Sequence, residues 1–124
     1  MTTRTFVLGT RGSRLALAQS TTVARAIEEA GARLGEEVRV NLEVVRTHGD
    51  VSAAPLAALG GVGVFAAQLR LALLGGECDL AVHSFKDLPT APTPGLRIAA
   101  VPQREDPRDA LCAADGVTLA SLPE

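Results

Sequence analysis

The chain has 124 residues, which suits one compact domain or one domain with part of a second. Hydrophobic residues make up 47% of it but only 2% are aromatic, so the core must be aliphatic. The net charge is −2 without a basic stripe, which argues against a nucleic-acid partner because phosphate binding needs concentrated Lys and Arg. No apolar stretch reaches membrane-spanning length and no signal peptide follows Met1, so we expect a cytoplasmic protein without a membrane partner.

The N-terminal part alternates the patterns of strands and helices. An apolar run over residues 6–9 predicts a buried strand, and the turn that follows ends at Ser13, which can cap a helix. Apolar residues then recur at helical spacing over residues 15–30, and Gly31 and Gly35 are expected to end this helix. Three of its charged residues are expected to face water: Arg25, Glu28 and Glu29.

The rest of the chain continues the alternation. Strict period-two patterning over residues 38–44 predicts a half-buried strand near a sheet edge, and residues 48–64 are typical of a loop. A second helix is expected over residues 65–73, with a pair of glycines as its stop. Buried strands are expected at residues 78–83 and 96–101.

This order of elements indicates βαβ units, and therefore an α/β fold with a mostly parallel, mixed sheet flanked by helices. In such sheets the ligand site lies at the carboxyl ends of the strands, where the loops are. Three loops occupy such positions: Thr10–Ser13, Thr47–Asp50 and His83–Pro89.

The strongest candidate for chemistry follows the strand at residues 78–83. Ser84, Lys86 and Asp87 bring a hydroxyl, a cation and a carboxylate to one strand end, a combination that can bind a charged ligand and manage protons. Lys86 is also the single lysine among 12 basic residues. The alternative is that Lys86 and Asp87 are solvated loop charges with a weak mutual attraction.

The turn at Thr10–Ser13 is a second candidate. Backbone N–H groups at a helix N-terminus, together with Arg11 and the Ser13 hydroxyl, make a natural carboxylate site. The alternative is ordinary helix capping by Ser13, with Arg11 on the surface.

Three further motifs favour structural roles. Gly60–Gly63 lacks the Lys-Ser/Thr ending of a phosphate loop and is expected to be a flexible loop. His48 and His83 have too few Cys or acidic neighbours for a metal site, so no metal is predicted and His83 is expected to be structural. The charged run at residues 104–109 is expected to be solvated surface.

Four segments in order resemble the porphobilinogen deaminase (hydroxymethylbilane synthase) family, of which the chain would be the N-terminal portion. The segments are Thr10–Ser13 with the adjoining Leu15–Gln19, then Thr47–Asp50, Ala81–Pro89 and Arg104–Ala110. No single segment is decisive, but the ordered set at the family's spacing is specific and covers almost the whole chain. The resemblance implies a fold similar to type II periplasmic binding proteins, with two such domains and a smaller third one, in a complete enzyme that is a monomer.

The resemblance also implies a transferase reaction of tetrapyrrole, and hence heme, biosynthesis. Porphobilinogen units lose ammonia and are joined head to tail on a covalently held dipyrromethane cofactor, and the linear tetrapyrrole hydroxymethylbilane is released. Asp87 matches the catalytic carboxylate, which near pyrrole N–H groups would stabilise the cation left by ammonia and assist proton transfer. The other matches are Ser84 and Lys86 for cofactor carboxylates, Arg11, Ser13 and Gln19 for the substrate's acetate and propionate groups, and Phe65 for a ring close to the pyrroles.

The sequence departs from the family in two respects. Many members carry Lys at the positions of Ala58 and Val62, so this loop is not expected to supply charge, although its closure over the site stays open. The sequence also ends at Glu124, before the family's Arg-rich cofactor-binding segment and the cysteine that anchors the cofactor. Neither Cys78 nor Cys112 lies in that cysteine's context, and both are expected to be reduced thiols.

We therefore expect residues 1–103 to form an incomplete first domain and residues 104–124 to be a hinge and the truncated start of a second. The 124 residues alone are not expected to turn over. Two alternatives remain open: a small-anion binding module with the same architecture, and an inactive truncated gene product.

Overall fold

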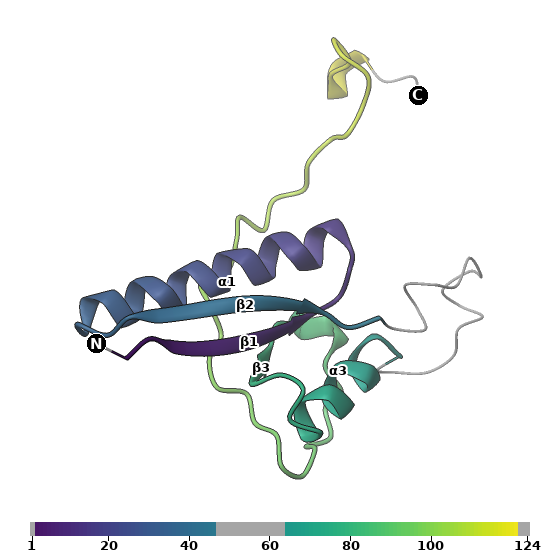
Figure 1. Ribbon diagram of the computed structural model, residues 1–124. Helices are drawn as coiled ribbons and strands as arrows, with labels where there is room; N and C mark the ends of the chain where they lie inside the picture. The colour runs from purple at the N-terminus through teal and green to yellow at the C-terminus, as the bar shows by residue number, and fades with distance from the viewer. Residues whose placement is uncertain (1, 47–63, 122–124) are drawn as a thin grey trace.

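The computed structural model describes residues 2–46 and 64–121, which form a small parallel sheet with helices on both faces (Figure 1). The elements in chain order are β1 (Arg4–Thr10), α1 (Arg14–Arg33), β2 (Val38–Val44), α3 (Val64–Leu74), β3 (Leu80–Ala81) and the short 3-10 helices η2 (Phe85–Asp87) and η3 (Leu119–Ser121). The strand order is β2-β1-β3 and both pairings are parallel. The predicted α/β class with a parallel sheet is confirmed. None of the helices in these residues is long and apolar enough to cross a membrane.

The two α-helices pack on opposite faces of β1. Leu8 is completely buried and contacts Ala24 of α1 and Val40 of β2. The next residue, Gly9, points the other way, because successive strand residues face opposite sides of a sheet. A Cβ atom at Gly9 would lie 3.0 Å from Cδ2 of Leu69 in α3. The buried aliphatic residues therefore lie on both faces of the sheet, under α1 and under α3, and Figure 1 shows the two helices on opposite sides of the strands.

Helix α1 begins as predicted and ends at Arg33, between the two glycines that were expected to mark its end. Ser13 is its N-cap, and the Ser13 hydroxyl accepts a 3.2 Å hydrogen bond from the Ala16 N–H. Gly31 lies in the last turn of the helix and is buried against β2, where a Cβ atom would lie 2.8 Å from Cβ of Val38. The stop is Gly35, which has a φ of 75° that favours glycine.

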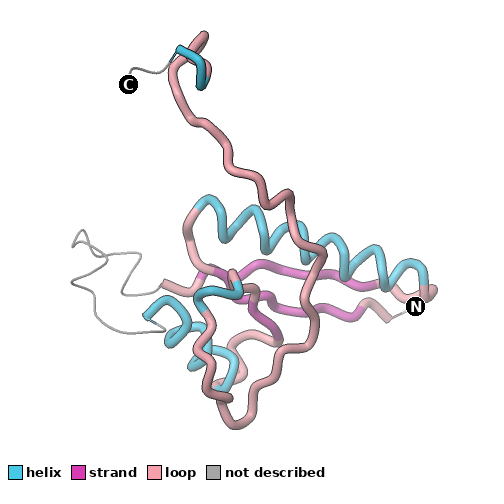
Figure 2. Tube along the Cα trace, turned by 180° about the vertical axis from the view of Figure 1, so that it is seen from behind, coloured by secondary structure: helices cyan, strands magenta, loops and turns pink. Residues whose placement is uncertain are grey.

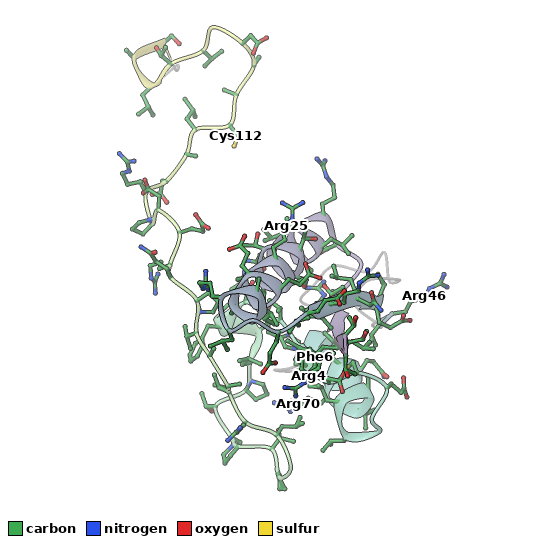
Figure 3. The ribbon with its side chains drawn as sticks, turned by 60° about the vertical axis from the view of Figure 1, so that its left-hand side comes forward. Arg4, Phe6, Arg25, Arg46, Arg70 and Cys112 are labelled. Carbon is green, nitrogen blue, oxygen red and sulfur yellow. The ribbon has the colours of Figure 1, made fainter. Side chains whose placement is uncertain are left out.

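Within residues 2–46 and 64–121, strand β2 lies at the edge of the sheet, as its period-two pattern predicted. One expectation about its neighbour α1 is wrong, since Glu28 does not simply face water. The Glu28 carboxylate is half-buried and accepts a 2.9 Å hydrogen bond from the Val40 N–H. Glu28 thereby ties the helix to the edge strand, while Arg25 and Glu29 are exposed as expected (Figure 3 shows Arg25).

Strand β3 is shorter than the predicted strand at residues 78–83. Only Leu80 and Ala81 pair with β1. Before them, Asp79 takes over the pairing: its carboxylate accepts a 2.7 Å hydrogen bond from the Val7 N–H, and its own N–H donates to the Val7 carbonyl at 2.9 Å. The side chain of Asp79 therefore stands where a longer strand would place a backbone carbonyl.

The strand predicted at residues 96–101 does not form. Ile98 and Val101 are 60% and 70% exposed, and the chain runs on as an extended segment that leaves the sheet and ends at η3 (Figures 1 and 2). An apolar segment becomes a strand only where it finds a partner for its backbone groups, and the described residues supply none here. The charged run at 104–109 lies in this segment and is exposed, as expected.

Candidate active site

Two of the three predicted loops meet at one edge of the sheet. Because β1 and β3 are parallel neighbours, with Leu8 opposite Leu80 and Gly9 opposite Ala81, both strands end on the same side. The turn after β1 and the loop after β3 therefore lie next to each other. The third predicted loop, Thr47–Asp50, lies outside the described residues.

The turn between β1 and α1 presents hydrogen-bond donors to this edge. The oxygen of Ser13 is used by the helix cap, which leaves its proton available to a ligand. The first turn of α1 contains no acidic residue, so no carboxylate of the helix competes for its positive end. Arg11 is half-buried beside it. Anion binding at this turn stays a prediction, and the arrangement of donors is compatible with it.

The loop after β3 is folded by short backbone hydrogen bonds. The Asp87 N–H donates to the Ser84 carbonyl at 2.9 Å and the Leu88 N–H donates to the Phe85 carbonyl at 3.1 Å, which forms η2. Within this turn Lys86 is exposed while Asp87 is half-buried. No ion pair joins the two in the described part of the chain. The two side chains therefore differ in their environment, since Asp87 is partly withdrawn from water and Lys86 is not.

A direct contact links the loop after β3 to helix α1. The Ser84 side chain makes no capping hydrogen bond to η2, and its hydroxyl instead donates to Oε1 of Gln19 in α1 at 3.4 Å. Ser84 and Gln19 are 65 positions apart in the chain. The structure thus brings together one residue predicted for the cofactor and one predicted for the substrate.

The pKa of His83 depends on charged residues near the carboxyl ends of β1 and β3. Burial lowers the pKa of His83, the Asp87 carboxylate opposes this effect, and the positive charges of Arg70 and Arg11 lower the pKa further. The lowered pKa favours the neutral imidazole, and the charges that act on it come from three different segments of the chain. Charges of Asp87, Arg11 and Arg70 thus all act on this half-buried histidine.

Arg70 was missed by the sequence analysis. It is the single charged residue of α3, whose sequence is otherwise apolar except for Gln68, and it is half-buried. A lone charge in an apolar helix is costly to bury unless it faces a polar site. The isolated charge of Arg70 within the apolar sequence of α3 was therefore the signal that could have identified this residue.

The remaining predicted positions are less defined. Phe65 lies in the first turn of α3, but its side chain is outside what the structure describes, as are Ala58 and Val62. Cys78 is a free, buried thiol below Gly9, and burial raises its pKa, so it is a poor nucleophile. Cys112 is exposed on the extended segment, away from the sheet (Figure 3).

The fold is that of an α/β protein with a parallel sheet, and charged and polar side chains gather at the carboxyl ends of β1 and β3. The sequence model described as "Porphobilinogen deaminase, dipyromethane cofactor binding domain" matches residues 6–124. The chain therefore belongs to the porphobilinogen deaminase family.

Curated relatives agree with this assignment. The chain is 58% identical over 117 residues to a porphobilinogen deaminase of Cutibacterium acnes. This match covers 94% of this chain and 33% of the relative. It is 53% identical over 123 residues to that of Thermobifida fusca, with 99% of this chain and 37% of the relative covered. A porphobilinogen deaminase of Leifsonia xyli is 55% identical over 117 residues, with 94% and 34% covered. The chain thus spans about a third of the length of the relatives it matches.

Proposed function

We propose that this chain forms the N-terminal part of a porphobilinogen deaminase that joins porphobilinogen units head to tail, with loss of ammonia, to give hydroxymethylbilane. The observation that carries the proposal is the meeting of the Asp87 turn with the Arg11–Ser13 turn, joined by the contact between Ser84 and Gln19, in a chain of this family. Asp87 is the proposed catalytic residue, because a half-buried carboxylate stabilises a nearby cation more strongly than one in water.

The substrate would be held by its carboxylates. Arg11, with the N–H groups at the start of α1, offers a charge-assisted site, and the free proton of Ser13 adds a donor. Gln19 borders the same space through its contact with Ser84. We propose the Phe65 ring as a neighbour of the pyrroles, on the resemblance alone. Asp87 then faces a substrate held at its two carboxylates, and could stabilise the cation that forms when ammonia leaves and transfer a proton.

Dipyrromethane would supply the covalently held pyrrole on which the units are joined. The chemistry of the edge fits such a group, since the exposed ammonium of Lys86 and the hydroxyl of Ser84 suit its carboxylates. Neither Cys78 nor Cys112 is proposed as its attachment point, because one is buried with a raised pKa and the other lies far from the site.

The proposal extends to the architecture of the whole protein. We propose a fold similar to type II periplasmic binding proteins, with residues 1–103 as part of the first domain and residues 104–124 as the hinge and the start of the second. The exposed apolar residues of the extended segment support this, since they need a covering partner. The complete protein is proposed to be a cytoplasmic monomer that acts on porphobilinogen and binds neither nucleic acid nor membrane.

A chimera tests the proposed function. Residues 1–124 of this chain replace the matching segment of the Thermobifida fusca porphobilinogen deaminase, to which they are 53% identical. We expect the chimera to consume porphobilinogen and release ammonia and hydroxymethylbilane, while the 124-residue chain alone does neither. A folded chimera that binds porphobilinogen without turnover would favour the small-anion binding module instead, and one that does not bind it would favour an inactive gene product.

A further inference from the structure

Two hydroxyl side chains are buried where the aliphatic core meets the site. Thr10, the last residue of β1, and Ser20 of α1 are both 0% exposed, and in the described part of the chain they are the only buried polar residues. The Ser20 hydroxyl donates to the Thr10 hydroxyl oxygen at 2.7 Å. A valine and an alanine would fill the same space without polar groups to satisfy, so packing alone does not account for the pair.

The pair is directional. Because Ser20 supplies its proton to Thr10, the Thr10 proton is free to donate elsewhere, and it reaches the carbonyl of Arg11 at 3.2 Å and that of Ala16 at 3.4 Å. The Thr10 backbone is held as well, since its carbonyl accepts a 2.9 Å hydrogen bond from the Val45 N–H. Thr10 is thus fixed to the chain after β2 by its backbone and to α1 by its side chain.

The segment between these two residues carries three of the proposed substrate-binding residues. Arg11 follows Thr10 directly, Gln19 precedes Ser20 directly, and Ser13 lies between them. The hydrogen bond between the two hydroxyls therefore joins the ends of this segment, Thr10 in β1 and Ser20 in α1, to each other. A shift of either end would move the Arg11 guanidinium or the Gln19 amide relative to the loop that holds Asp87.

We propose that Thr10 and Ser20 are positioning residues, whose hydroxyl pair sets Arg11 and Gln19 at the spacing that a pyrrole with two carboxylates requires. This inference rests on the proposed function and deepens it. A positioning role predicts weaker substrate binding when the pair is broken, whereas a merely structural role predicts lower stability with unchanged binding.

The test uses the chimera with Thr10→Val and Ser20→Ala as the disrupting variants. Thr10→Ser keeps the hydroxyl, and Thr22→Val is the matched control, because Thr22 is an exposed residue of α1 whose hydroxyl donates only to its own helix, at the Ala18 carbonyl. We expect Thr10→Val to lower kcat/KM for porphobilinogen roughly 10- to 100-fold, mainly through KM, and Ser20→Ala to lower it roughly 3- to 10-fold. Thr10→Ser and Thr22→Val should stay within about twofold of the parent.

Binding gives a second readout that does not need turnover. In the Asp87→Asn background, the Kd for porphobilinogen from titration calorimetry should rise by the same factors as KM. Unchanged KM and Kd in folded Thr10→Val and Ser20→Ala chimeras would overturn this inference alone. If Thr10→Val unfolds, Ser20→Ala carries the test, since it deletes one oxygen at a helical position that favours alanine. An inactive, non-binding parent chimera would overturn the proposed function and this inference with it.

Discussion

Gly9→Ala is the substitution whose effect follows most directly from the packing. Gly9 is the second-last residue of β1, and a Cβ there would lie 2.8 Å from Sγ of Cys78 and 3.0 Å from Cδ2 of Leu69. Leu69 can adjust its flexible end, but Cys78 is buried and has a single side-chain torsion, so the strand or the loop before β3 must move. We expect overpacking to lower the free energy of unfolding by about 1–3 kcal/mol.

The cause can be isolated with a double-mutant cycle. Cys78→Ala removes the atom that clashes and by itself costs about 1 kcal/mol through lost contacts. The double variant should then be more stable than the sum of the single effects by about 1–2 kcal/mol, because the new methyl group occupies the space left by the sulfur. Urea unfolding of the 124-residue chain followed by far-UV circular dichroism measures all four proteins, since the sequence has no Trp or Tyr for fluorescence. Effects that add to within about 0.5 kcal/mol would refute the proposed contact.

Two further predictions concern the cap of α1 and the pH dependence of stability. Ser13→Ala should cost about 0.5–2 kcal/mol in the same unfolding assay, because the Ala16 N–H loses its acceptor, and Ser13→Thr should recover most of the loss; equal stability of all three would contradict the cap. The folded protein lowers the pKa of His83, so as the pH falls the unfolded chain takes up the proton first. Proton uptake then favours the unfolded chain, and the free energy of unfolding decreases as the pH falls below the unfolded pKa of about 6.5. His83→Gln should therefore lose less stability than the parent between about pH 7.5 and 5.5, and identical pH profiles would contradict the burial of the imidazole.

The elements that could be predicted from the sequence are those set by local patterns. The period of two over residues 38–44 and the helical spacing in α1 and α3 each define one apolar face. The structure buries these faces only in part, since Val40 and Leu69 are buried whereas Leu15 is 64% exposed and Val44 is 47% exposed. The Ser13 cap was predictable for the same reason, since its partner Ala16 is only three residues away.

The errors come from long-range contacts. Glycine is typical of the end of a helix, but at Gly31 a larger residue would also clash with Val38. This contact depends on the position of β2 and not on the sequence of the helix. The segment at residues 96–101 has the pattern of a strand but no partner in the described residues. The Glu28 carboxylate can similarly accept a hydrogen bond from the Val40 N–H only when α1 packs along β2.

The site shows the same division. Ser84, Asp87, Arg11 and Ser13 were predicted as site residues because each follows a predicted strand, and the parallel pairing of β1 and β3 places their two turns at one edge of the sheet. Arg70 was missed because it comes from a helix on the other face of the sheet, and only its charge in an apolar context marked it. The hydroxyl pair of Thr10 and Ser20 was also not predictable, since their burial depends on how α1 packs on β1.

Replacement of Asp87 in the chimera tests the central claim most directly. The variant is Asp87→Ala, and Asp115→Ala is its control, because Asp115 is an exposed carboxylate on the extended segment. We expect Asp87→Ala to lower kcat for hydroxymethylbilane formation by at least about 100-fold, with a circular dichroism melting curve close to that of the parent, while Asp115→Ala retains full activity. A folded Asp87→Ala chimera with kcat close to that of the parent would contradict the account and remove Asp87 from the mechanism.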